Sequence, residues 1–95
     1  MPKGYFIARV TVTNPEDYAA YAAAASRAIA LYDGKPLVRG GTCEVMEGEG
    51  RARNVVIEFP SFDQAKAYYH SPEYQAAKAL RAGAGIADMI AVEGA

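Results

Sequence analysis

Residues 5–17 have the sequence YFIARVTVTNPED, in which a strand pattern is followed directly by the start of a helix. Residues 5–12 are rich in β-branched and aromatic types and alternate as a half-buried strand does. Asn14 is a favoured N-cap residue, and Pro15 suits the first position of a helix. We therefore expect a strand over residues 5–12 and then a helix that ends at Asp33-Gly34.

The residues after this helix have the pattern of a hairpin. Residues 37–46 form a second predicted strand, interrupted by Gly40-Gly41, and residues 53–59 form a third. Gly48-Glu49-Gly50 offers a turn between the two strands. We expect these strands to pair with each other.

A broken helix and a last strand complete the pattern. Ser61 begins a capping-box sequence, which predicts a helix that ends at His70. Ser71-Pro72 repeats the signal of a cap followed by proline, so a second helical piece starts there and ends near residues 83–85. A last strand is expected over residues 87–93.

The order β-α-β-β-α-β over residues 1–95 predicts one ferredoxin-like α+β domain. Its four-stranded antiparallel sheet has the order 4-1-3-2, with both helical segments on one face. We expect the helix-facing set to be Phe6, Ala8, Val10 and Val12 in the first strand and Val55, Ile57 and Phe59 in the third. Tyr5, Ile7, Arg9 and Thr11, with Asn54, Val56 and Glu58, fall on the opposite face. No helix covers that face, so a homodimer is expected.

Composition excludes several classes of function. Ten Lys and Arg residues stand against 11 Asp and Glu, and no basic run occurs, so we expect no nucleic-acid partner. No apolar stretch approaches the roughly 20 residues of a membrane span, and we expect a cytoplasmic protein with no membrane partner. A single cysteine, Cys43, and a single histidine without an acidic cluster predict no disulfide, no metal site and no cofactor.

Several segments together resemble the family called domain of unknown function 1330. They are residues 5–12 with Asn14-Pro15-Glu16, Arg39-Gly40-Gly41, residues 56–62, and Ser71-Pro72-Glu73-Tyr74-Gln75. The resemblance implies a ferredoxin-like protomer of the dimeric α/β-barrel superfamily, in which two sheets pack face to face. The family has no established activity. The wider superfamily includes small monooxygenases, isomerases, decarboxylases and haem-handling enzymes, which is a likeness of fold alone.

Arg9 and Glu58 are the first candidates for catalysis. They share the open face of two adjacent central strands, so we expect an ion pair inside the dimer. The arginine would grip a substrate carboxylate, and the glutamate would orient it or act as a base. The alternative is a structural ion pair or a dimer contact.

His70 and three further residues are weaker candidates. His70 lies at the expected helix break, where an imidazole is suited to acid or base catalysis. The alternative is a structural role, because the helix dipole favours a histidine at the C-terminus of a helix, and we prefer this alternative. Arg39, before Gly40-Gly41, is a candidate for substrate binding or simply a strand-edge residue. The hydroxyls of Tyr69 and Tyr74 are candidates to line a substrate pocket, with core packing as the alternative.

These features favour a small homodimeric protein that binds a small organic acid or similar metabolite, either as a binding module or as a cofactor-independent enzyme. The alternative is a non-catalytic structural or stress-related dimeric module, in which the charges only hold the dimer together. A cavity that joined Arg9, Glu58 and His70 would favour the first interpretation.

Overall fold

The computed structural model describes residues 2–95, which form four strands and three helices. The elements are β1 (Gly4–Val12), α1 (Pro15–Leu31), β2 (Lys35–Arg39), β3 (Arg53–Phe59), α2 (Phe62–His70), α3 (Pro72–Leu80) and β4 (Gly85–Glu93). Their order confirms the expected ferredoxin-like arrangement.

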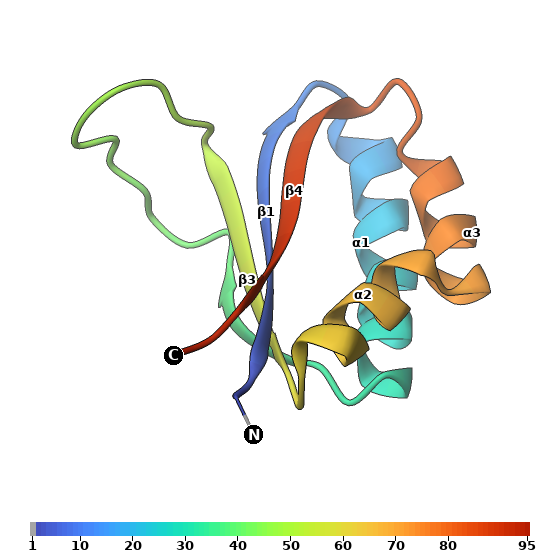
Figure 1. The fold of residues 1–95 in the computed structure, drawn as a ribbon. Helices are drawn as coiled ribbons and strands as arrows, with labels where there is room; N and C mark the ends of the chain where they lie inside the picture. Colours follow the sequence, from blue (N-terminus) through green and yellow to red (C-terminus); the bar gives the residue numbers. More distant parts are fainter. Residues whose placement is uncertain (1) are drawn as a thin grey trace.

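The strands form one antiparallel sheet in the order β2-β3-β1-β4, which is the predicted order read from the other edge. All three helices pack on one face of this sheet, and the other face is left open (Figure 1). Within the described residues, no helix combines the length and the apolar character that a membrane span requires.

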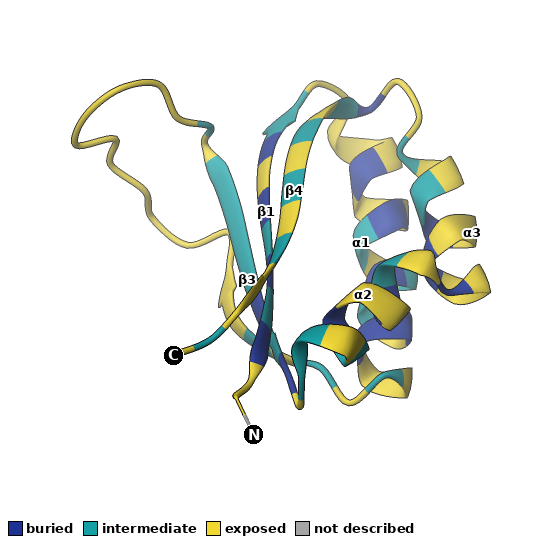
Figure 2. Cartoon of the chain, viewed as in Figure 1, coloured by how far each residue is buried: buried dark blue, intermediate teal, exposed yellow. Residues whose placement is uncertain are grey.

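Burial alternates along most of β1, as the sequence pattern predicts (Figure 2). Phe6, Ala8 and Val10 are buried beneath the helices, as are Ile57 and Phe59 from β3. Burying such side chains stabilises the fold by about 1.5–3 kcal/mol for each large one. The core between sheet and helices is therefore built from alternate strand residues.

An N-cap residue determines where each helix begins. The Asn14 side chain accepts a hydrogen bond from the backbone nitrogen of Asp17 at 3.2 Å, and Pro15 is the first residue of α1. The Ser61 hydroxyl accepts from the backbone nitrogen of Gln64 at 3.1 Å and so starts α2.

The predicted break in the second helical segment is confirmed. Buried Ser71 ends α2 by donating from Oγ to the Tyr68 carbonyl at 2.7 Å. The same hydroxyl accepts from the backbone nitrogen of Tyr74 at 3.0 Å and caps α3. His70 is the last residue of α2, as expected. One serine thus holds the angle between the two helices.

The expected second strand over residues 37–46 is wrong in its bounds, because β2 spans Lys35–Arg39. Gly40 has a φ of 68°, in the left-handed region, and turns the chain out of the sheet. The next residues form an exposed loop up to Ala52, drawn in green beyond the sheet in Figure 1. The turn expected at residues 48–50 is therefore part of a long loop rather than a tight hairpin.

Candidate functional site

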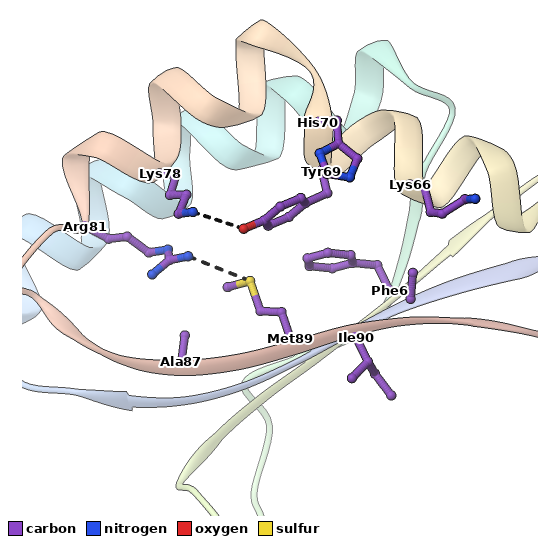
Figure 3. A pocket seen from close by; sticks show the side chains of 10 residues that line it. Phe6, Lys66, Tyr69, His70, Lys78, Arg81, Ala87, Met89 and Ile90 are labelled. Carbon is purple, nitrogen blue, oxygen red and sulfur yellow. Dashed lines mark hydrogen bonds between the residues drawn. The ribbon is translucent and has the colours of Figure 1, made fainter.

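A cleft of about 410 Å³ lies between β4 and the helices α2 and α3 (Figure 3). Its volume is within the range of small-ligand sites. The lining residues are Phe6, Lys66, Tyr69, His70, Lys78, Arg81, Ala87, Met89, Ile90 and Ala91. We call this space the cleft.

Helix geometry brings the polar residues of the cleft together. Lys66 and His70 are one turn apart on α2, and Tyr69 lies beside them. Lys78 lies in the last turn of α3, and Arg81 is the C-cap residue of that helix. Because Ser71 breaks the helix, these residues reach the cleft from two directions.

Tyr69 is held by contacts on both sides of its ring. Its ring stacks on Phe6, with centroids 6.1 Å apart and an angle of 27° between the planes. Lys78 Nζ donates to the Tyr69 hydroxyl at 3.0 Å. Since the hydroxyl accepts this bond, its own proton remains available to donate to a ligand.

Arg81 places a positive charge deep in the cleft. Its guanidinium lies 5.4 Å from the centroid of the Tyr21 ring, and Nη2 is 3.9 Å from the sulfur of Met89. The Nε atom is buried and has no hydrogen-bond partner among the described residues. An unsatisfied buried donor costs about 1–3 kcal/mol, more when charged.

The other end of the cleft is more exposed. His70 is exposed, and its ring meets that of Tyr69 edge to face at 5.2 Å. Lys66 Nζ lies 3.6 Å from a carboxylate oxygen of Asp63, an exposed pair within α2, and 4.7 Å from the Phe62 ring centroid. Exposed pairs of this kind contribute about 0–1 kcal/mol, so Lys66 remains free to meet an anion.

Tyr74 lies behind the cleft rather than in its lining. It is 0% exposed, its hydroxyl is 2.9 Å from that of Tyr21, and it donates to the Met89 sulfur at 3.3 Å. Burial raises the pKa of Tyr21, with Tyr74 nearby as a further cause, and burial also raises the pKa of Tyr68. Tyr21 and Tyr68 therefore stay protonated at neutral pH and do not act as bases.

The expected ion pair between Arg9 and Glu58 is wrong, although both residues lie on the open face. In the register of β1 and β3, Arg9 pairs with Asn54 and Glu58 pairs with Tyr5. Four positions along a strand separate them by about 13 Å. The Tyr5 hydroxyl donates to Glu58 at 3.1 Å, and this bond raises the pKa of Tyr5.

Arg9 and Arg39 lie on different parts of the surface, and both are outside the cleft. Arg9 Nη2 donates to the Glu49 carbonyl at 3.2 Å and so holds the long loop. Arg39 is exposed at the end of β2, beside a hollow of about 50 Å³ between α1 and the sheet that Arg53 also lines. Neither residue lines the cleft, so Arg9, Glu58 and His70 do not share a cavity.

Sequence reasoning therefore found two residues of the cleft, Tyr69 and His70, and missed three cations. Lys66, Lys78 and Arg81 were recognisable only as charged residues at helical spacing. The available signals were the spacing of four between Lys66 and His70 and of three between Lys78 and Arg81, but such spacings are equally typical of a solvated helix face. Within residues 2–95, no group of three or more His, Cys, Asp or Glu side chains is placed to hold a metal ion.

The family profile for DUF1330, a domain of unknown function, matches residues 3–95. The chain belongs to the DUF1330 family. This confirms the family that the sequence segments indicated, and it assigns no activity. No curated protein matches this member of DUF1330.

Solved structures share the fold of this DUF1330 protein at low sequence identity. A protein of unknown function from Rhodopseudomonas palustris has a TM-score of 0.74 and 19% identity, covering 99% of this chain and 83% of its own. A dimeric ferredoxin-like protein of unknown function from Thermobifida fusca has a TM-score of 0.63 and 21% identity, with coverages of 99% and 91%. A cofactor-independent oxygenase from Streptomyces nogalater has a TM-score of 0.55 and 12% identity, with coverages of 97% and 92%. At these identities the likeness shows the fold alone.

Proposed function

We propose that this DUF1330 protein binds a small organic acid in the cleft with its own side chains. One observation carries the proposal: the ionisable lining of the cleft consists of Lys66, Lys78, Arg81, His70 and the Tyr69 phenol, without a carboxylate. The whole chain has a net charge of −1, so this is a local concentration of positive charge. Such a concave cationic surface attracts anions.

The geometry also fits an acid with a carbon body. Arg81 lines the cleft, and its guanidinium nitrogens are donors that suit a carboxylate. Lys78 and the Tyr69 hydroxyl add two donors at the same end. Phe6 and Met89 supply apolar surface for the rest of the ligand.

The protein acts as a homodimer in this proposal, joined through the open face in the manner of a dimeric α/β barrel. Ile90 and Val92 of β4 are 57% and 41% exposed on the face that no helix covers. A face with such residues gains free energy when a second copy covers it. The T. fusca protein, which has a similar fold, is described as dimeric. The cleft lies mainly on the helix side of the sheet, so dimerisation leaves it accessible.

Ligand binding is tested by thermal denaturation and calorimetric titration with small carboxylates at low ionic strength. We expect at least one acid to raise the melting temperature, because a ligand of the folded state stabilises it. Lys78→Gln should weaken binding about tenfold, as the loss of one charge-assisted hydrogen bond does. Lys35→Gln, which removes a charge from the opposite edge strand β2, is the matched control and should bind normally.

Two results would contradict the proposal. If no carboxylate shifts the melting temperature or produces heat, the cleft is not an acid-binding site. Equal weakening by Lys78→Gln and Lys35→Gln would show that only the general charge of the protein matters. Either result would favour the alternative of a non-catalytic structural module.

A further inference from the structure

The nitrogen-bearing side chains of the cleft form two pairs that belong to different helices. Lys66 and His70 stand on α2, whereas Lys78 and Arg81 stand at the end of α3. Figure 3 shows these pairs at opposite ends of the cleft, with the ring of Tyr69 between them. The positive charge is thus divided rather than gathered at one point.

Apolar surface separates the two pairs. Phe6 and Met89 lie below Tyr69 between the two ends, and Ala91 also lines the cleft (Figure 3). This surface offers no hydrogen bond to a charged group. A ligand that uses both ends must therefore carry its polar groups apart, joined by an apolar body.

The two ends differ in strength. At the α3 end, Lys78 donates to the neutral Tyr69 hydroxyl and Arg81 contacts the Met89 sulfur, and neither cation has a carboxylate partner among the described residues. At the α2 end, Lys66 already has the exposed Asp63 at 3.6 Å. The α3 end is therefore the stronger anion site.

We infer that the ligand of the cleft carries an acidic group at each end of a short apolar body, with one group held by Arg81 and Lys78 and the other by Lys66 and His70. This inference rests on the proposed function and narrows its class of acid. Ligands of this class are diacids, in which each carboxylate meets at least one cation, Arg81 and Lys78 at one end and Lys66 at the other.

The test compares diacids with monoacids of the same chain length by calorimetric titration of the whole chain. The pairs are succinate with butyrate, glutarate with pentanoate, adipate with hexanoate, and pimelate with heptanoate. For the length that spans the cleft, we expect the diacid to bind about tenfold more tightly or better, since its second carboxylate gains charge-assisted hydrogen bonds. An equal affinity for diacid and monoacid at every length would overturn the inference and leave the proposed function standing.

A double variant tests whether the α2 end of the cleft causes the preference for diacids over monoacids. In Lys66→Gln/His70→Gln, the ratio of diacid to monoacid affinity should fall to about one, because the second carboxylate loses its partners. The matched control is Lys35→Gln, in which the ratio should stay as in the natural chain. A ratio that persists in the double variant would contradict the assignment. The binding of no acid of either kind would overturn the proposed function as well.

Discussion

The hydroxyl oxygens of Tyr21 and Tyr74 lie 2.9 Å apart in the core and join α1 to α3. The Tyr74 hydroxyl also donates to the sulfur of Met89 at 3.3 Å. Because a phenol has one proton, we assign the proton of the shared bond to Tyr21. The hydrogen bonds thus connect α1, α3 and the strand β4, which lies beneath the cleft.

Tyr74→Phe should lower the free energy of unfolding by about 1–3 kcal/mol, because it leaves the buried Tyr21 hydroxyl without its acceptor. Tyr21→Phe should cost less, since Tyr74 keeps Met89 as its partner. The double variant should cost less than the sum of the two single changes. Urea denaturation measures all three, and strictly additive effects would contradict the assignment of the shared bond.

Stability should fall at alkaline pH because of the buried phenols. Burial raises the pKa of Tyr21 and Tyr68 above the ordinary value of 10.0. Groups with a higher pKa in the folded state stabilise it fully below the unfolded pKa, and this contribution is lost as pH rises beyond it. We expect urea denaturation to show declining stability above about pH 10. The ultraviolet absorbance of the phenolate measures tyrosine ionisation directly. If all seven tyrosines ionise near their ordinary pKa while the protein stays folded, the predicted loss of stability is wrong.

Ser71→Ala should destabilise the protein more than Ser61→Ala does. Both serines are N-caps, and loss of such a cap costs about 0.5–2 kcal/mol. Ser71 is also buried and donates to the Tyr68 carbonyl, which the alanine variant leaves without that bond. Thermal denaturation of the two variants makes the comparison. Equal melting temperatures would show that the second hydrogen bond contributes nothing.

Asp88→Asn should loosen the long loop without unfolding the protein. Arg51 joins this loop to the sheet through Asp88 Oδ2 at 2.9 Å and Thr11 Oγ1 at 3.0 Å. Exposed ion pairs contribute about 0–1 kcal/mol, so global stability should change little. Cleavage after the loop residues Glu47 and Glu49 by a glutamyl endopeptidase should become faster. Asp63→Asn, which alters the pair on α2, is the control and should leave this rate unchanged.

Val92→Glu should separate the proposed homodimer, because it places a charge on the open face. Light scattering after size exclusion should give about 20 kDa for the natural chain, twice its mass of 10.1 kDa, and about half of that for the variant. Leu31→Glu changes an exposed apolar residue at the end of α1, away from the open face of the sheet, and should remain dimeric. A natural chain that is monomeric at micromolar concentration would contradict the dimer.

The faces of the strands and the helix starts were predictable because local rules determine them. Phe6 and Val10 are buried as the alternation indicates, and Ser71 breaks the helix where a cap followed by proline predicts it. The register of β1 and β3 was not predictable in this way. A shift of four residues keeps Arg9 and Glu58 on the same face, so alternation alone cannot bring them together.

The bounds of the second strand and the lining of the cleft could not be predicted, because both depend on contacts between residues far apart in the sequence. Residues 41–46 alternate as a strand does, but they have no partner because the chain leaves the sheet at Gly40. His70 was identified from its place at the helix break, and Tyr69 from a hydroxyl that could line a pocket. Arg81 was missed, because only the packed arrangement of α3 and the sheet shows that its side chain lines the cleft.

The pairing of β1 with β4 joins the first strand of the chain to the last one, and it determines when the cleft can form. The residues of β1, α2 and α3 all precede residues 85–93 in the chain, and the apolar surface around Phe6 and Tyr69 lacks its cover until β4 joins the sheet. Contacts between such distant segments slow folding. The cleft therefore forms only when β4 pairs with β1, and a partly folded chain without this pairing exposes apolar surface that favours aggregation.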